Sequence, residues 1–429
     1  MKADYENGAI GLMVIGVVYE RLINVLLRGA TLASKFLLII FLAKFLDVLE
    51  VGMYGLLSAV VIYSIYLVGF ELYVFANRLV IGEKIFRKDI FVSQVLIGSL
   101  VYLVLLPFAY LLYQLLEYEG VYLYYLIFIV YFEYLILEVY RYFVATERQL
   151  KGSLILFVGT GLWPMLLVLV FMLDEGSREL ETVFFFWLIG SFSGMIYGLL
   201  SLEKSIISFK SVKEWGVILV SKGIKITFLY FLAALAVKAL FTVDRFIVED
   251  YASLSLLAPY VLYMSVSLAV LSFIDASVHA FFYPKIVNAS ANGQEHEFKK
   301  LFRLNLRDSM LVGFFLSLLV MLVGVLGVDF LDKTEYKVNL VFLPILLFIM
   351  LLQAVGVCYQ TGLYAKHDDR YIALVKMVML ATFLVSNFIL LPYLSFYAVF
   401  WSLGLVFFLQ AVLYIVRFQA ILKVGRSLC

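Results

Sequence analysis

Long apolar runs follow one another along the whole chain, separated by short polar segments. A run of about twenty apolar residues is what an α-helix needs to cross the hydrocarbon core of a bilayer. None of the runs alternates apolar and polar positions, as the strands of a transmembrane β-barrel do. The pattern therefore predicts an all-α integral membrane protein with twelve transmembrane helices. The predicted spans are 22–45, 54–77, 90–112, 122–142, 153–173, 183–202, 219–243, 257–283, 308–329, 338–361, 371–391 and 394–416.

The polar segments between the predicted spans alternate in charge. The basic segments lie at 78–88, 141–151, 204–222, 285–307 and 366–370. The acidic segments lie at 47–50, 117–119, 174–181, 244–250 and 329–335. Because the cytoplasmic loops of membrane proteins carry the excess of Lys and Arg, we expect the basic segments and both termini to be cytoplasmic.

Two pairs of landmarks recur at one offset along the chain. Tyr54 opens the second span and Tyr260 opens the eighth, each after an acidic segment, and they lie 206 residues apart. The same offset relates Arg78 to Pro284, at the far ends of these two spans. A repeat of six spans returns the chain to its starting side, so both halves have the same orientation. This predicts two six-helix bundles related by a pseudo-two-fold axis along the membrane normal, with a cavity between them.

The domain boundaries follow from this division. We expect a cytoplasmic or interfacial lead-in over 1–21, an N-terminal bundle over 22–202, a cytoplasmic interfacial linker over 203–218, a C-terminal bundle over 219–416 and a cytoplasmic tail over 417–429. No segment between the spans is long enough to form a soluble catalytic or nucleotide-binding domain. We therefore expect a protein that is not an enzyme.

Composition supports the membrane class and adds little else. Hydrophobic residues make up 65% of the chain and charged residues 15%, whereas soluble domains have about 25% charged residues. The net charge of +2 gives no indication of a nucleic-acid partner. The two cysteines, Cys358 and Cys429, have no metal-binding spacing. We expect no metal and no cofactor.

The first span carries a polar seam on one face. The seam consists of residues at steps of three and four, namely Arg21, Asn24, Arg28, Thr31 and Lys35. Lys35 lies within an otherwise apolar run, where a cation costs roughly 2.5–3.5 kcal/mol on insertion scales. Such a side chain faces a partner or a wet cavity rather than lipid.

Other charged residues also fall inside the spans, and they permit two interpretations. In the first, a basic cavity formed by Arg28, Lys35, Lys238, Lys376 and Lys225 attracts a diphosphate. In the second, charges pair across helices. We favour the cavity for Lys35 and Lys238, because neither has an acid within a turn on its own helix. Pairing is favoured for Glu138 with Arg141, three residues apart.

Three acids inside or near the spans could serve ion coupling, namely Glu71, Glu133 and Asp275. A carboxylate in a low-dielectric cavity can hold a proton or Na⁺. Glu71 and Glu133 could instead pair with Lys35 or Lys238. Asp275 has His279 one turn away, so a simple ion pair and a functional site are equally favoured there.

Several motifs resemble those of polysaccharide transporters. The motifs are the stretch from Lys44 to Gly52-Met-Tyr54-Gly55; Gly69-Phe-Glu71 with Asn77-Arg78; Asp244-Arg245 with Ala258-Pro-Tyr260; and Phe282-Tyr-Pro284. In order and spacing they resemble the lipid-linked oligosaccharide (O-antigen) flippases of the multidrug/oligosaccharidyl-lipid/polysaccharide superfamily. The chain departs from that pattern by having Ala258-Pro in place of Gly-x.

The resemblance implies that the protein flips a polyprenyl-diphosphate-linked oligosaccharide for O-antigen, capsule or exopolysaccharide synthesis. It implies a bacterial or archaeal cytoplasmic membrane, membrane lipid as surroundings, and a polysaccharide polymerase and chain-length machinery as partners. The alternative in the same superfamily is a cation-coupled multidrug exporter, which predicts an acid-rich cavity. A membrane polysaccharide polymerase is less favoured, because it needs a large outward loop that the chain lacks.

Overall fold

The structure, a computed structural model, describes residues 2–82, 87–115, 120–202 and 208–427. These residues form helices and short turns, with no strand among them. The long helices are α1 (Lys2–Phe45), α2 (Val48–Gly69), α4 (Arg87–Leu115), α5 (Gly120–Ala145), α8 (Leu180–Leu200), α10 (Ile224–Tyr251), α11 (Leu254–Ile274), α13 (Glu295–Gly327), α15 (Phe342–Ala365), α16 (Asp369–Leu394) and α17 (Ala398–Ser427). The shorter ones are α3 (Tyr73–Gly82), α6 (Gln149–Leu156), α7 (Leu162–Leu173), α9 (Phe209–Ile218), α12 (Ala280–Ala291) and α14 (Thr334–Val338).

Eleven described helical stretches are long and apolar enough to cross a membrane. The last of them, Asp369–Lys423, contains both α16 and α17, which a 3₁₀ turn at Ser395–Tyr397 divides. Ser395 has a positive φ of 50°, which ends α16 after Pro392. Counting these two helices separately gives twelve spans. The chain is therefore an all-α, multi-pass membrane protein, as the apolar runs predicted.

The second span begins and ends earlier than predicted. α2 starts at Val48, because the Val48 N–H donates to Asp47 Oδ1 at 2.7 Å and the Asp47 N–H donates to Glu50 Oε2 at 3.0 Å. The acidic residues that indicated a loop are thus the N-terminal cap of the helix. At its far end α2 stops at Gly69. Phe70 and Glu71 have φ of 48° and 53°, and α3 follows.

Three spans contain a π-helical turn, in which backbone hydrogen bonds reach back five residues. Phe157–Gly161 joins α6 to α7, Leu219–Gly223 joins α9 to α10, and Asp275–His279 joins α11 to α12. The predicted spans over these regions are therefore correct in number but not uniformly α-helical.

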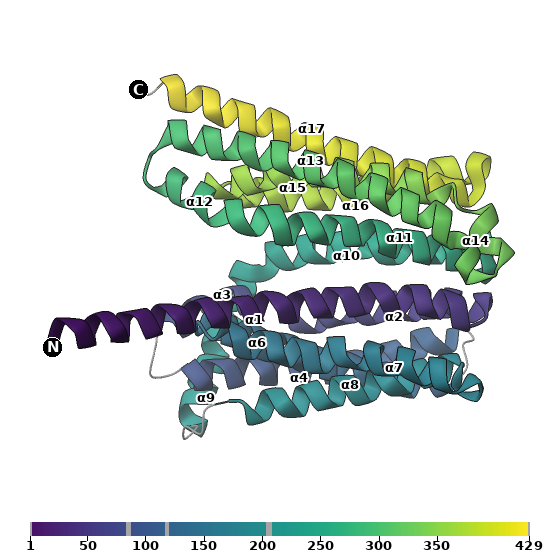
Figure 1. Cartoon of the computed structure of the whole chain (residues 1–429), viewed down its shortest axis with the longest axis horizontal. Coiled ribbons are helices and arrows are strands. Elements are labelled where there is room, and N and C mark those ends of the chain that lie inside the picture. Colours follow the sequence, from purple (N-terminus) through teal and green to yellow (C-terminus); the bar gives the residue numbers. More distant parts are fainter. Residues whose placement is uncertain (1, 83–86, 116–119, 203–207, 428–429) are drawn as a thin grey trace. The chain divides into compact units, whose positions relative to one another are not determined.

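The chain divides into two compact units. Unit 1 is Met1–Leu38 with Ser64–Phe228, and unit 2 is Ile39–Tyr63 with Leu229–Cys429. In unit 1, α5 lies against α6 and α8; in unit 2, α15 lies against α11, α13 and α17 (Figure 1). The division into two six-helix bundles, 22–202 and 219–416, stays a prediction. The predicted lead-in is helical from Lys2 and continuous with α1, whereas 203–207 of the predicted linker lie outside the described residues.

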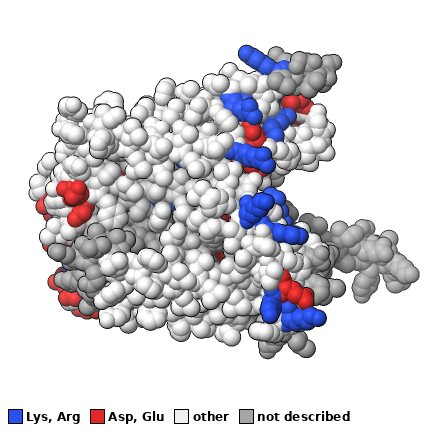
Figure 2. Space-filling view, turned by 180° about the vertical axis from the view of Figure 1, so that it is seen from behind, with Lys and Arg blue, Asp and Glu red and all other residues white. Residues whose placement is uncertain are grey.

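Charge is concentrated at the ends of the helices (Figure 2). On the face shown, Lys, Arg, Asp and Glu gather in patches, and most of the surface between the patches is uncharged. In unit 2, the basic end includes Lys300 and Lys366, and the acidic end includes Asp329 and Glu335. The uncharged surface between the ends is the part expected to lie in hydrocarbon.

Candidate functional site

The polar seam of α1 lies along α5 and α6 within unit 1. Arg28 Nε donates to Ser153 Oγ at 3.2 Å, and Arg28 Nη2 donates to Tyr140 Oη at 3.0 Å. The Ser153 hydroxyl in turn donates to Asn24 Oδ1. The guanidinium thus has two neutral partners, and the Arg28 side chain remains exposed. Its positive charge is held in place without being neutralised.

Lys35, one step along the seam, has an acidic neighbour from another helix. Glu133 on α5 lies within electrostatic range of Lys35. Glu133 Oε1 also accepts a hydrogen bond of 2.9 Å from Trp187 Nε1 on α8. Glu133, an acid that the sequence left open as a partner of Lys35, is therefore an electrostatic neighbour of Lys35. The Lys35 side chain is nevertheless exposed.

An aromatic stack adjoins Glu133 and was not predicted from the sequence. The rings of Trp163 and Trp187 stack with centroids 5.7 Å apart and an interplanar angle of 13°. Phe184 continues the stack at 6.0 Å from Trp187. Little in the sequence indicated this contact, because Trp163 and Trp187 lie on different spans.

Glu71 belongs to a buried network at the break between α2 and α3. Arg141 lies 3.8 Å from Glu71 and 2.6 Å from Glu138, and its guanidinium lies 3.6 Å from the centroid of the Tyr73 ring. Gln94 donates to Glu138. The predicted Glu138–Arg141 pair is confirmed, and Glu71 has Arg141 as a partner. Burial is the main cause that raises the pKa of Tyr73 to about 12, and the negative charge of Glu71 raises it further, so the phenol stays protonated.

The motif residues of spans two, seven and eight meet in unit 2. Tyr260 Oη donates to Asp244 Oδ2 at 2.5 Å, and Asp244 is fully buried. Arg245 Nη1 donates to the Gly55 carbonyl oxygen and, at 3.1 Å, to Ser58 Oγ. These hydrogen bonds hold three spans together, and Arg245 Nε is left without a partner among the described residues.

The remaining motif residues have varied positions. Lys44 forms an ion pair with Asp332 and lies 4.9 Å from the Phe330 ring centroid. Gly52 packs directly on the backbone of α11, as described below, and Tyr54 is half-buried. Arg78 on α3 and Pro284 on α12 are exposed.

Lys333 caps the C-terminal end of α1, a role that was not predicted from the sequence. Its ammonium donates to the carbonyl oxygens of Ala43, at 2.8 Å, and Leu46, at the C-terminal end of α1. Cations favour this end of a helix, where carbonyls lack partners within the helix. Burial lowers the pKa of Lys333, against the opposing effect of Asp47. Its position in an acidic loop gave no indication of this capping role.

The predicted cavity lysines divide between the two units. Lys225 on α10 is exposed and belongs to unit 1, as do Arg28 and Lys35 of α1. Lys238 on α10 and Lys376 on α16 are half-buried and belong to unit 2. Each unit therefore carries cations inside its spans.

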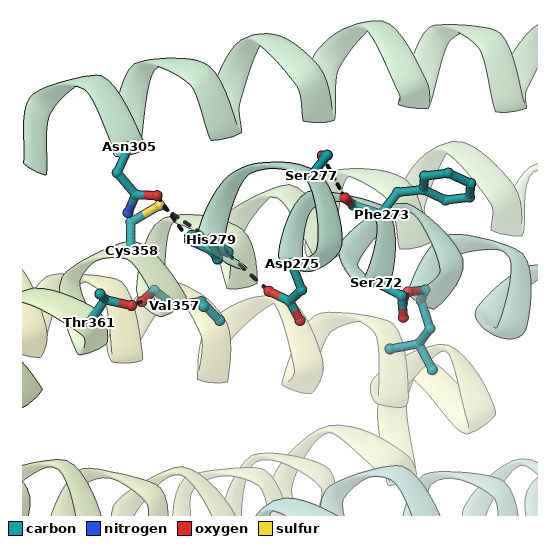
Figure 3. A network of polar contacts seen from close by, with 10 residues as sticks. Ser272, Phe273, Asp275, Ser277, His279, Asn305, Val357, Cys358 and Thr361 are labelled. Atoms are coloured by element: carbon teal, nitrogen blue, oxygen red, sulfur yellow. Dashed lines mark hydrogen bonds and ion pairs between the residues drawn. The ribbon is translucent and has the colours of Figure 1, made fainter. Parts of the chain in front are cut away.

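Asp275 and His279 lie in the π turn between α11 and α12 of unit 2 (Figure 3). His279 Nε2 lies 3.9 Å from Asp275 Oδ1 and 4.0 Å from Cys358 Sγ on α15. His279 Nδ1 lies 3.1 Å from Asn305 Oδ1 on α13. The ion-pair geometry expected from the spacing is present, and Asn305 and Cys358 are additional neighbours. Across the described residues, no group of three or more His, Cys, Asp or Glu side chains could hold a metal ion.

Comparison with known proteins gives the fold. No protein-family model and no curated protein sequence matches the chain. Among solved structures, "Lipid II flippase MurJ, inward closed conformation" aligns with TM-score 0.75 and 13% identity, covering 91% of this chain and 87% of that one. An inward-facing multidrug resistance MATE transporter of the MOP superfamily aligns with TM-score 0.72 and 11% identity, covering 92% and 96%.

A third solved structure is similar in fold over a comparable length. It is a MOP superfamily transporter from Pyrococcus furiosus, whose report describes a binding pocket of reverse polarity, with TM-score 0.56 and 10% identity. It covers 94% of this chain and 95% of that one. The chain has the fold of MOP superfamily transporters.

Proposed function

We propose that this protein flips a polyprenyl-diphosphate-linked oligosaccharide across a bacterial or archaeal cytoplasmic membrane, for the synthesis of surface polysaccharide. One observation carries the proposal: α1 presents two exposed cations, Arg28 and Lys35, two turns apart within a membrane span. A diphosphate headgroup needs fixed cations inside the membrane, and a guanidinium and an ammonium are the two side chains that bind phosphate best.

The surroundings of these cations suit an anionic ligand. Arg28 is oriented by two hydroxyls, those of Ser153 and Tyr140, which leave its charge intact. Lys35 has Glu133 nearby, and Glu133 is itself held by Trp187. The aromatic stack of Trp163 and Trp187 beside Glu133 is buried, so it fixes the position of Glu133 within unit 1.

The fold supports membrane transport as the activity. One protein of this fold is a lipid II flippase by name. By analogy, the bundles 22–202 and 219–416 would expose the site alternately to the two sides of the membrane. The basic segments and both termini would be cytoplasmic, and H⁺ or Na⁺ would be the coupling ion. Polysaccharide polymerase and chain-length proteins would act next.

A cation-coupled multidrug exporter is the second candidate. The observation that favours it is the half-exposed carboxylate of Asp275, whose side chain is 55% exposed within a span. An exporter of cationic drugs needs such an acid, and MATE transporters share this fold. The exposed cations of α1 count against it, because they would repel the same drugs.

One deletion experiment separates the two candidates. Cells lacking the protein should accumulate lipid-linked glycan in the inner leaflet, lose surface polysaccharide and keep normal sensitivity to cationic dyes. The plasmid-borne wild type should reverse both glycan changes. Hypersensitivity to cationic dyes with normal surface polysaccharide would overturn the flippase proposal and favour the exporter.

A further inference from the structure

His279 differs from the other two histidines of the chain. It is buried inside a membrane span, whereas His296 and His367 are exposed in the segments between helices or at a helix start. It also lies in a π turn, where the Ala280 N–H bonds back to the Asp275 carbonyl. Turns of this kind inside helices occur frequently at functional sites.

Each nitrogen of the His279 ring faces a different kind of group. Nδ1 lies 3.1 Å from Asn305 Oδ1, an acceptor, so Nδ1 carries the proton of the neutral ring. Nε2 then presents a lone pair toward Asp275 Oδ1, 3.9 Å away. Turning the Asn305 amide over would exchange the roles of the ring nitrogens but would leave Nε2 facing the carboxylate. The ring can therefore gain a proton on one side or the other, and Asp275 is placed to stabilise the cation.

The two partners differ in access. The Asp275 side chain is 55% exposed and that of His279 is 9% exposed. A proton can thus reach the carboxylate first and pass from its oxygen to Nε2. The products are a carboxylate and an imidazolium, which attract each other, so no charge is left unpaired.

The amide nitrogen of Asn305, beside the His279 ring, is a buried donor without a partner among the described residues. The Asn305 residue is fully buried. Figure 3 shows Asn305 reaching from α13 toward Cys358 and the His279 ring. The Ser309 hydroxyl lies beside the Cys358 thiol. Unsatisfied donors of this kind commonly bind an internal water, which would give the proton a second neighbour.

Three neighbours of this pair come from α13 and α15. Cys358 on α15 is titratable, and the Asp275 carboxylate bears on it electrostatically. Asn305 and Ser309 on α13 are neutral. Gain or loss of one proton therefore changes the net charge of the whole cluster.

We propose that His279 is a proton-binding site, with Asp275 as its counter-charge, and that it couples proton uptake to the conformation of the π turn. Protonation turns a 3.9 Å separation into an attraction between Nε2–H and the carboxylate, which draws together the two ends of the turn. The helix can yield there, because Pro284 has no N–H for the Ala280 carbonyl one turn back. This rests on the proposed transport function and names the proton as its coupling ion.

The test uses the full-length protein in lipid nanodiscs with one histidine left. In a His296→Gln, His367→Gln chain, ¹⁵N NMR of the remaining ring should show a protonation step between about pH 5 and pH 8. Adding Asp275→Asn should lower the midpoint by about one pH unit or more, because the counter-charge is lost. In the matched control, His279→Gln with His296→Gln, the exposed His367 should titrate and Asp275→Asn should leave it unchanged.

A His279 ring that stays in one state over this range, or a midpoint that ignores Asp275→Asn, would overturn the proposal. Coupling is tested in proteoliposomes with and without a pH gradient. The gradient should accelerate flipping of lipid-linked glycan by the wild type, and His279→Gln should abolish that acceleration. Glycan flipping that ignores the gradient would overturn the coupling while the flippase function stands. A titrating His279 in a protein that moves no glycan would overturn the flippase function instead.

Discussion

At the scale of single residues, the charges inside the spans form two groups. Asp244 and Arg245 are buried and hydrogen-bonded by groups from other helices, and Arg141 pairs with Glu138 on its own helix and with Glu71 at the α2–α3 break. Arg28 and Lys35 are exposed; Arg28 donates to two neutral hydroxyls and Lys35 lies near Glu133. The first group stabilises the fold, since breaking a buried pair leaves an uncompensated charge. The second group lies at the surface of α1, where the proposed ligand would bind.

Replacing Asp244 should destabilise the protein strongly. Asp244→Ala would leave the Tyr260 hydroxyl and the Arg245 charge without a carboxylate in a fully buried site, at a cost of about 3–5 kcal/mol. Tyr260→Phe removes one hydrogen bond and should cost about 1–3 kcal/mol. Thermal unfolding in detergent, followed by loss of the monodisperse fraction, measures both. The exposed Asp250→Asn on the same helix is the control, and equal stability of Asp244→Ala and Asp250→Asn would contradict the structural role.

Replacing Lys35 should abolish export without affecting folding. Lys35→Gln and Lys35→Ala remove the charge, whereas Lys35→Arg keeps it and should retain more surface polysaccharide. All three proteins should accumulate in the membrane as the wild type does. Lys300→Gln, in an exposed pair at the basic end of α13, is the control and should export normally. Full export by Lys35→Gln would show that this cation is not used.

At the scale of elements, the close contacts between spans depend on residues without side chains. A Cβ on Gly52 would collide with the Leu254 carbonyl oxygen at the start of α11, and one on Gly55 would collide with Val261. A backbone carbonyl cannot rotate away as a side chain can. The approach of α2 to α11 therefore fixes Gly52 as glycine, while Gly55 offers its carbonyl to Arg245.

Gly52→Ala should move α2 away from α11 and destabilise the protein by about 1–3 kcal/mol, as overpacking does. The control is Gly29→Ala on α1, where an added Cβ has nothing within 4 Å. That change should be neutral or stabilise by up to about 1 kcal/mol, because alanine is the better helix former. In the same detergent, Gly52→Ala should therefore lower the apparent melting temperature, whereas Gly29→Ala should leave it unchanged or raise it. Matching values would show that α2 can relax.

Some elements could be predicted from the sequence and others could not, for physical reasons. The twelve spans could be predicted because apolar length alone decides which segments cross a bilayer. The early start of α2 could have been predicted from Asp47 and Glu50, which form a cap. The break at Phe70–Glu71 could not, because neither residue favours a positive φ. The pairing of Glu71 with Arg141 could not, because Arg141 comes from another helix, whereas Glu133 was already a candidate neighbour of Lys35 from the sequence.

At the scale of the whole molecule, the alternation of charge predicts which ends of the helices face the cytoplasm. Single cysteines at Asp250 and Glu335, in a chain without Cys358 and Cys429, should react with an impermeant thiol reagent in intact cells. Cysteines at Lys151 and Lys300 should react only after the membrane is opened. Both pairs are exposed positions at helix ends. Labelling of the Lys300 position from outside would contradict the predicted orientation. Glu117, a further position in an acidic loop, lies outside the described residues.

The most direct test of the central claim is transport by the purified protein. Proteoliposomes are prepared with a fluorescent polyprenyl-diphosphate-linked oligosaccharide, and the fraction reaching the other leaflet is measured by an impermeant quencher. The wild type should move this lipid, Lys35→Gln should not, and Lys300→Gln should match the wild type. Transport of a cationic dye in the same vesicles, with no movement of the lipid-linked glycan by the wild type, would contradict the account.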